Sequence, residues 1–261
     1  EASVVLDRQD YLESAVKCAK FVLSTLVNES RLMRSYNVGR SKISAYLEDY
    51  ACLVNGLLVL HEATLQDVWL DEAIKLGNLM VDLFWDETGS VFFDTGYDHE
   101  NLIIRPRSDQ DGAMPSGGAV AVDVLLRLSV ISGEKELGRI ASAALGNVTE
   151  LMSRYPISAG HWLCALDFHM SDVKQIAIIG DNESPETKRL LREVFGSYIP
   201  NRVLVGSDGA GDSVSSLTPL LKGRSPIEGK STAFVCENYV CDLPVNDPED
   251  LTRILMPKSK S

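Results

Sequence analysis

The 261-residue chain has no apolar run of the roughly 18 residues that a membrane-spanning helix needs, so the sequence predicts no membrane span. It is also poor in positive charge, because 25 Lys and Arg stand against 37 Asp and Glu, a formal net charge of −12. Binding along a phosphate backbone requires a positive field, so this balance argues against nucleic acid as a partner. The remaining composition, 45% hydrophobic and 24% charged, predicts a globular protein with a sizeable core.

Cysteine and histidine are scarce as well, with five and four residues. The cysteines are odd in number and scattered, which makes a poor disulfide framework. Cys18, Cys52 and Cys164 lie in apolar helical runs, where a free cysteine behaves as a small hydrophobic residue. We therefore expect buried thiols, which favour a reducing intracellular compartment. The histidines lack metal-ligand spacing, and neither a metal nor a cofactor is expected.

Residues 1–5 carry no initiator methionine, no basic n-region and no apolar h-region. We therefore expect the chain to be a fragment of a longer protein. Any targeting signal of that protein would lie upstream of the fragment, so the sequence leaves its organelle open.

Hydrophobic periodicity predicts six helices in the first 172 residues. They cover residues 9–27, 46–64, 67–85, 116–132, 134–153 and 158–170. The first, third and fifth repeat apolar side chains at i, i+3, i+4 and i+7, as amphipathic helices do. The others are the buried members, and the second and fourth are apolar around most of their circumference. The alternation repeats about every sixty residues, so the sequence predicts three helical hairpins that form part of an α/α toroid.

Two long linkers precede the buried helices, at residues 28–45 and 86–115. Loops longer than about 12–15 residues tend to be functional or disordered. The second linker contains a short predicted strand within residues 89–96. Both linkers deliver the chain to the start of a buried helix, so we expect them at the same end of the helices, where a cleft would form.

The apolar pattern changes after residue 172, where short buried strands replace the long helices. The predicted strands cover residues 175–180, 202–206 and 232–236, the last turning into 239–241. A helix over 185–196 separates the first two strands, and this order favours a parallel pair. The predicted parts of the chain are a toroid portion, a small α/β region and a disordered tail, at residues 1–172, 173–256 and 257–261.

Several short motifs resemble the C-terminal part of the spermatogenesis-associated protein 20 family, the thioredoxin-domain-containing proteins of uncharacterised class 255. They are Leu47-Glu48-Asp49-Tyr50-Ala51, Gly56-Leu57-Leu58, Phe84-Trp85-Asp86, Phe92-Phe93-Asp94-Thr95, Asp111-Gly112-Ala113-Met114-Pro115-Ser116-Gly117 and Ala233-Phe234-Val235-Cys236-Glu237-Asn238. The resemblance covers nearly the whole chain, with the motifs in the family's order.

This resemblance implies a mainly α fold, a partial α/α toroid followed by a small α/β C-terminal segment. The family pairs an N-terminal thioredoxin-like domain with a six-hairpin toroid similar to glycosidases and N-acylglucosamine 2-epimerases. The chain would then hold three of the six hairpins. Its expected partners would be the thioredoxin-like domain, the remaining hairpins and a sugar ligand.

The starts of the second and fourth helices supply the candidate site. Asp49 and Asp111 occupy equivalent places one hairpin apart, and paired carboxylates are the usual acid and base groups in sugar chemistry. We predict a sugar or sugar derivative there, turned over by an epimerase-like or glycosidase-like reaction. The residues expected to bind it are Glu48, Tyr50, Arg105, Arg107, Ser116 and Gly117.

Simpler interpretations stay open at this stage. Carboxylates in a first helical turn satisfy the helix dipole, and Ser116 is a natural N-cap, so the site could be structural and the chain a non-catalytic scaffold. Thiol chemistry at Cys236 and Cys241 is a third hypothesis, which holds only if the two sulfurs approach each other and are not both buried. His99, in the second linker, is the one histidine placed to act as a base.

Overall fold

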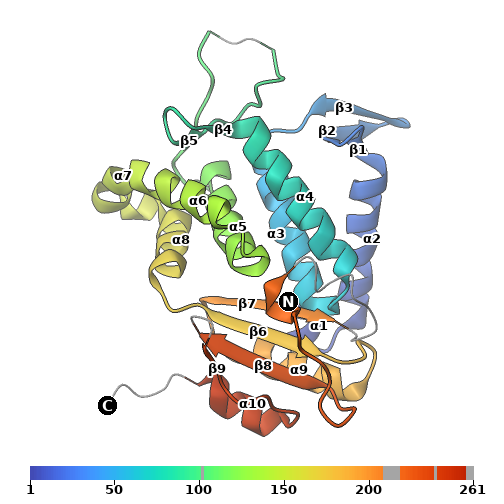
Figure 1. The fold of residues 1–261 in the computed structure, drawn as a ribbon. Coiled ribbons are helices and arrows are strands. Elements are labelled where there is room, and N and C mark those ends of the chain that lie inside the picture. The colour runs from blue at the N-terminus through green and yellow to red at the C-terminus, as the bar shows by residue number, and fades with distance from the viewer. Residues whose placement is uncertain (101–102, 208–217, 238–239, 257–261) are drawn as a thin grey trace.

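The computed structural model describes residues 1–100, 103–207, 218–237 and 240–256 (Figure 1). The tail predicted at 257–261 lies outside the described residues. The helices are α1 (Ala2–Val5), α2 (Gln9–Thr25), α3 (Leu47–Thr64), α4 (Asp67–Phe84), α5 (Gly117–Ser132), α6 (Lys135–Asn147), α7 (Thr149–Arg154), α8 (Gly160–Met170), α9 (Pro185–Gly196) and α10 (Pro248–Leu255). The strands are β1 (Val27–Asn28), β2 (Arg31–Asn37), β3 (Arg40–Ser44), β4 (Trp85–Asp86), β5 (Val91–Phe92), β6 (Lys174–Ile179), β7 (Arg202–Ser207), β8 (Thr232–Glu237) and β9 (Val240–Cys241). Helices dominate, which confirms a mainly α fold.

The predicted helices are present, with one difference. The range 134–153 holds two helices, because the chain breaks at Val148 between α6 and α7. The Thr149 hydroxyl bonds back to the carbonyl of Gly146, a local bond that competes with the regular helical pattern. Among the described helices, none combines the length and the hydropathy that a membrane span demands.

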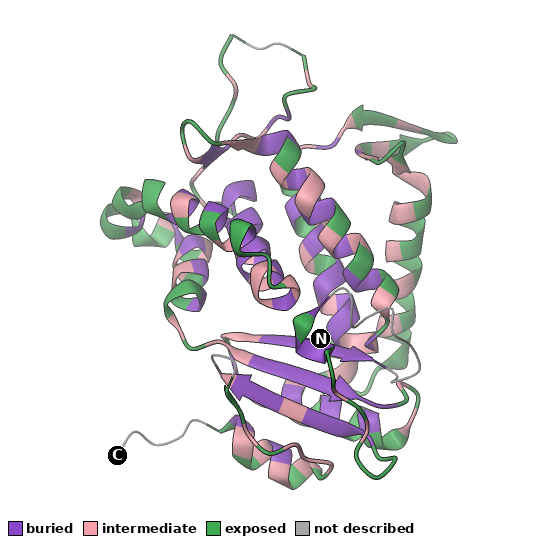
Figure 2. Ribbon diagram, in the orientation of Figure 1, coloured by how far each residue is buried: buried purple, intermediate pink, exposed green. Residues whose placement is uncertain are grey.

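Helices α3 and α5 form the centre of the helical layer. Helix α3 packs against α4 and α5, and α5 packs in turn against α6 and α8. Helix α5 is buried along most of its length, as its apolar circumference predicts (Figure 2). Helix α2 lies on the flank of the layer, and none of its residues is fully buried. The core therefore centres on the two helices whose starts carry the candidate site.

The prediction of buried thiols is wrong, because Cys18, Cys52 and Cys164 are all exposed. Cys18 lies on the flanking helix α2, and Cys52 lies one helical turn before Gly56 on an exposed stripe of α3. An apolar run shows only that a helix has a buried face. The neighbours that cover the helix decide which of its residues are enclosed.

The first linker contains a β-hairpin that the sequence analysis did not predict. Strands β2 and β3 pair antiparallel, with β1 on the other edge of β2. The hairpin turns at Val38 and Gly39, which both have positive φ, between the paired residues Asn37 and Arg40. Such two-residue turns match the twist of the strands they join. In the second linker, the predicted short strand is β5, which pairs with β4.

The C-terminal region forms one sheet with strand order β7-β6-β8-β9. Strands β6 and β7 are parallel, which confirms the prediction, and β8 runs antiparallel to β6. Side chains alternate along β6, so that Ala177 and Ile179 face the helical core while Ile176 and Ile178 belong to a second cluster with α9 and α10. The sheet therefore lies between the helical layer and the two C-terminal helices (Figure 1).

The structure contains a disulfide that the cysteine count argued against. Cys236 on β8 and Cys241 on β9 are directly paired across the antiparallel strands, and their sulfurs are bonded. Counting cysteines could not anticipate this bond, because the β-hairpin, not the spacing, brings the two residues together.

Candidate ligand-binding cleft

The starts of α3 and α5 lie in direct contact, at the end of the helices to which the two linkers lead. A Cβ atom on Gly117 would lie 3.0 Å from the backbone nitrogen of Glu48, which is tighter than nine in ten real Cβ contacts. A side chain at this position would push the two helix starts slightly apart, whereas glycine lets them stay this close. The contact brings two sets of N-terminal backbone amides to one place.

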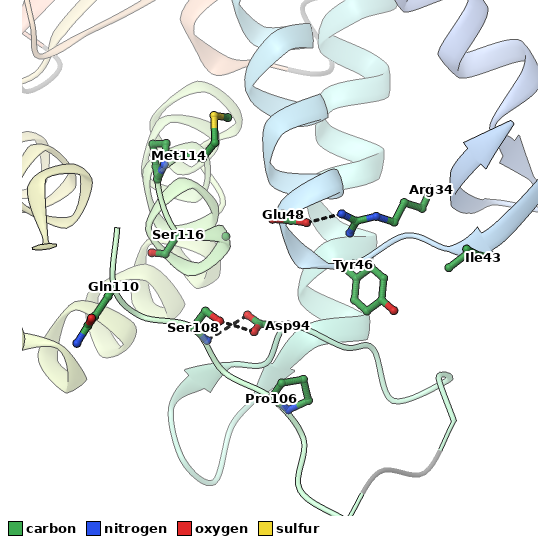
Figure 3. A pocket seen from close by; sticks show the side chains of 12 residues that line it. Arg34, Ile43, Tyr46, Glu48, Asp94, Pro106, Ser108, Gln110, Met114 and Ser116 are labelled. Atoms are coloured by element: carbon green, nitrogen blue, oxygen red, sulfur yellow. Dashed lines mark hydrogen bonds and ion pairs between the residues drawn. The ribbon is translucent and has the colours of Figure 1, made fainter. Parts of the chain in front are cut away.

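A cleft of about 660 Å³ opens beside this contact (Figure 3). Its wall comes from the β2–β3 hairpin, the start of α3, the second linker and the start of α5. The residues that line it are Arg34, Ile43, Tyr46, Glu48, Asp94, Pro106, Ser108, Gln110, Met114, Pro115, Ser116 and Gly117. The lining mixes charged, hydroxyl, amide and apolar groups, so it offers both hydrogen-bond donors and acceptors.

One side of the cleft carries an ion-paired guanidinium. Arg34 Nη2 lies 2.8 Å from Glu48 Oε1, and Nη1 lies 3.2 Å from Asp49 Oδ2. The hydrogen bond to Glu48 raises the pKa of Arg34 above its ordinary value. The guanidinium also stacks over the ring of Tyr46 at 4.9 Å. Arg34 therefore fixes the position of the Glu48 carboxylate at the rim (Figure 3).

The opposite side is held by Asp94. The Ser108 hydroxyl donates to its Oδ2 at 2.9 Å. The backbone carbonyl of Asp94 accepts the N–H of Leu47 at 3.0 Å, and the backbone N–H of Asp94 donates to the carbonyl of Pro106. These bonds fasten the second linker to the start of α3.

The two carboxylates predicted to be catalytic act as helix caps. Asp49 Oδ2 accepts the backbone N–H of Tyr46 at 2.9 Å. Asp111 accepts the N–H of Ser116 on Oδ1 and that of His161 on Oδ2, both at 2.8 Å, so it joins the starts of α5 and α8. Neither residue is among those that line the cleft. Each oxygen of Asp111 therefore holds a backbone N–H outside the lining of the cleft.

The residues predicted to bind substrate divide into two groups. Glu48, Ser116 and Gly117 line the cleft. Ser116 also caps α5 through its side-chain oxygen. Tyr50 lies in the core with no exposed surface, and its hydroxyl accepts the N–H of Leu32 at 2.9 Å. The aromatic side chain in the cleft is instead that of Tyr46, one helical turn earlier.

The two predicted arginines lie outside the cleft lining. Arg105 stacks over the Phe93 ring at 4.3 Å and donates a hydrogen bond to the carbonyl of Thr95. Arg107 forms an ion pair with Asp109 at 2.7 Å. Both side chains therefore brace the linker that carries them.

The cleft lining also includes Arg34, Tyr46, Asp94, Ser108 and Gln110, which were not predicted from the sequence. Arg34 lay in a linker without periodicity, so no sequence signal connected it with Glu48. For Asp94 there was a signal, because it stands inside one of the motifs that carry the family resemblance. Its position at the end of a short predicted strand did not show which way it would face.

His99, the predicted candidate base, lies behind Tyr46 and outside the cleft lining. Its ring meets that of Tyr46 edge to face at 5.1 Å, and its Nε2 lies 2.9 Å from Arg31 Nη2. Burial and the neighbouring Arg31 charge lower the pKa of His99 below its ordinary value. Across the described ranges, no group of three or more His, Cys, Asp or Glu side chains is arranged to hold a metal ion.

The fold and the cleft define a helical protein with a sheet packed beneath it and a polar cleft at the contact between two helix starts. No protein-family model matches the chain. It is 35% identical over 265 residues to spermatogenesis-associated protein 20 of Homo sapiens, covering 97% of this chain and 34% of the human protein. The rat protein of the same name is 34% identical over 269 residues, with the same shares covered. An uncharacterised protein of Caenorhabditis elegans is 28% identical over 255 residues, 94% of this chain and 34% of that protein.

The chain is therefore homologous to spermatogenesis-associated protein 20. It spans about a third of the length of the curated relatives it matches.

Proposed function

We propose that the cleft binds a sugar or sugar derivative within a carbohydrate-active protein of the α/α toroid type. The observation that carries this proposal is the lining of the cleft. A carboxylate held by Arg34 faces one side, Asp94 and Ser108 face the other, and the start of α5 closes the end. Small-molecule sites commonly enclose about 300–1,000 Å³ and place a few polar groups among apolar ones. A ring bearing several hydroxyls needs such alternating donors and acceptors.

In this proposal the chain contributes three hairpins of a six-hairpin toroid. The remaining hairpins and a thioredoxin-like domain belong to the longer protein. The homology to spermatogenesis-associated protein 20 supports this assignment, since the chain matches only about a third of those relatives.

We assign the ligand contacts to Glu48 and Asp94 and a positioning role to Asp49 and Asp111. An acid or base in a sugar reaction must exchange a proton with its substrate, so it needs a carboxylate oxygen that the substrate can reach. The Glu48 side chain is 56% exposed and lines the cleft, which meets this condition. Asp111 instead accepts a backbone amide on each oxygen and does not line the cleft. An epimerase-like or glycosidase-like reaction would then depend on Glu48 more directly than on Asp111.

The test is a binding screen against monosaccharides, amino sugars and sugar phosphates, read by thermal shift and then by calorimetry. Glu48→Gln and Asp94→Asn should weaken binding of any ligand found by at least about tenfold, the usual loss when a charged hydrogen-bond partner is removed. Glu13→Gln, an exposed change on α2, is the matched control and should leave affinity unchanged. Asp111→Asn should lower the melting temperature without ligand.

If no sugar raises the melting temperature of the wild type, or if Glu48→Gln binds it as tightly as the wild type does, the proposal fails. Activity that survives in Glu48→Gln but disappears in a folded Asp111→Asn variant would return the catalytic role to Asp111.

A second candidate function is a non-catalytic scaffold for the rest of the longer protein. The observation that favours it is an apolar groove of about 410 Å³ between α2 and α3. Leu12, Val22, Leu53 and Leu57 line this groove together with the exposed Gly56. Exposed apolar surface of this kind is expected to be covered by further helices or to cause self-association. Sedimentation of the isolated chain tests this: a clean monomer that melts cooperatively would count against the scaffold.

A further inference from the structure

The hairpin at the edge of the C-terminal sheet joins two cysteines of very different accessibility. Cys236 on β8 is 1% exposed, whereas Cys241 on the edge strand β9 is exposed. They form the disulfide already described, which closes a loop with a sequence separation of only 5. The stabilisation that a disulfide supplies grows with the length of the loop it closes. A disulfide that closes so short a loop therefore stabilises the fold less than one that closes a long loop.

A guanidinium lies against both sulfurs. Arg224 Nη2 is 3.0 Å from Cys236 Sγ and 3.4 Å from Cys241 Sγ. The group also stacks over the ring of Phe234 at 5.2 Å. Its Nη1 atom is buried and has no hydrogen-bond partner among the described residues.

This arrangement leaves a partly buried positive charge beside a neutral disulfide. No described carboxylate lies within ion-pair distance of Arg224. Burial of the guanidinium lowers the pKa of Arg224 below its ordinary value. A thiolate on either sulfur would supply the missing negative charge, and a neighbouring arginine is one of the features that lower a thiol pKa in reactive cysteines.

We propose that Cys236, Cys241 and Arg224 form a thiol–disulfide exchange site, which reacts with low-molecular-weight thiols and with accessible disulfides. In the reducing direction, an incoming thiolate attacks the exposed Cys241 Sγ. The Cys236–Cys241 bond breaks, and its electron pair leaves on Cys236 as a thiolate beside Arg224 Nη2. Cys241 is now joined to the incoming sulfur as a mixed disulfide.

A second thiol completes the reaction. It attacks the incoming sulfur of the mixed disulfide, forms a disulfide with it and releases Cys241 as a thiolate. Two thiols are thereby oxidised to one disulfide, the protein disulfide is reduced to two thiols, and the two protons of the incoming thiols end on the two cysteines. In the opposite direction Cys241 is the nucleophile and Cys236 resolves the mixed disulfide. In the reducing direction Arg224 makes Cys236 a better leaving group, and in the opposite direction it raises the fraction of the cysteines present as the reactive thiolate.

The experiment uses the full chain with Cys18, Cys52 and Cys164 changed to serine, so that any alkylation occurs at Cys236 or Cys241. The protein is equilibrated in buffers of reduced and oxidised glutathione and then alkylated. Mass spectrometry measures how many cysteines carry the alkyl group. We expect the two cysteines to gain or lose alkylation together and reversibly while the circular dichroism stays that of the folded chain. In the reduced protein, the pH dependence of alkylation at Cys241 should be centred below the ordinary cysteine pKa.

Variants at Arg224 separate this role from a structural one. Arg224→Gln should slow reduction by glutathione at least about tenfold and shift the alkylation profile to higher pH, because the thiolate loses its countercharge. Arg224→Lys keeps the charge and should restore most of the rate. Arg253→Gln, on the exposed face of α10, is the matched control and should leave the rate unchanged.

Two results would overturn the proposal. The first is a disulfide that is reduced only after urea unfolds the chain, since the bond would then be inaccessible in the fold. The second is an exchange rate and pH profile in folded Arg224→Gln equal to those of the wild type. If Arg224→Gln does not fold, the test is the pH dependence of alkylation in Arg224→Lys. Its midpoint must then stay below the ordinary thiol pKa, and a midpoint at the ordinary value would overturn the proposal.

Discussion

Acid should destabilise this protein through one buried histidine. His61 lies on α3 with no exposed surface. Its Nδ1 is 2.9 Å from the carbonyl oxygen of Gln66, so the neutral ring carries its proton there. Its Nε2 is buried without a hydrogen-bond partner among the described residues. Protonation would place both a charge and an unpaired donor in the core, and burial lowers the pKa of His61 from 6.5 to about 4.

The change in the free energy of unfolding with pH follows from the lowered pKa of His61. Above pH 6.5 the imidazole is neutral in both the folded and the unfolded chain. Between pH 6.5 and about 4 only the unfolded chain takes up the proton, so acid favours unfolding. Each pKa unit corresponds to about 1.4 kcal/mol, so the free energy of unfolding should fall by about 3 kcal/mol across this window from this group alone.

The assay is urea unfolding at several pH values between 7 and 4, with the free energy extrapolated to zero denaturant. Carboxylates also titrate near the lower limit, so the quantity to compare is the difference between the wild type and His61→Gln. That variant should lose most of the pH dependence between 6.5 and 5, even if it is less stable at pH 7. His169→Gln, an exposed change on α8, is the matched control and should keep the wild-type slope. Equal slopes in the wild type and His61→Gln would refute the reasoning.

Three substitutions probe other contacts, each read by urea unfolding. Arg127→Met should lower the free energy of unfolding by about 3 kcal/mol, because it removes the main partner of the nearly buried Glu62, which lies 2.9 Å away. The double variant with Glu62→Leu should recover part of that loss. Gly206→Ala should cost about 2 kcal/mol, because its Cβ would lie 2.8 Å from the backbone carbonyl oxygen of Ile178, which cannot move aside, as well as 2.6 Å from a methyl of Leu65; wild-type stability would contradict this packing. Ser116→Ala should cost about 1 kcal/mol by removing the cap of α5, whereas Ser116→Thr should retain most of it; an equal loss in both would point to packing instead.

The helices of the first half of the chain could be predicted from the local sequence pattern. Helices α3, α4 and α5 start and end within a residue or two of their predicted limits, because the period of apolar residues and the first-turn acids are properties of the chain itself. The parallel pair of β6 and β7 was predictable for the same reason, since a strand, helix and strand in succession leave few alternatives. The β2–β3 hairpin was missed because its strands are half exposed and show no clear alternation.

Only some of the residues that line the cleft could be predicted from the sequence. Glu48, Ser116 and Gly117 were predicted because they stand at helix starts, where polar residues are easy to recognise. Arg34 and Asp94 were not, because they join the cleft from separate segments whose relation is set by packing. The carboxylates that looked most suitable for catalysis, Asp49 and Asp111, carry the caps that shape the cleft. A capping acid and a catalytic acid look alike in sequence.

The sequence by itself determined most of the helices, the strands β6, β7 and β8 of the C-terminal sheet, and that two helix starts lie at one end of the layer. These are local or nearest-neighbour properties, set by backbone preference and the period of apolar side chains. Only the tertiary structure decided which carboxylates face the cleft, which thiols are exposed, and that Cys236 bonds to Cys241 beside Arg224. Those features depend on contacts between residues far apart in the chain, and their geometry is fixed only when the layers pack together.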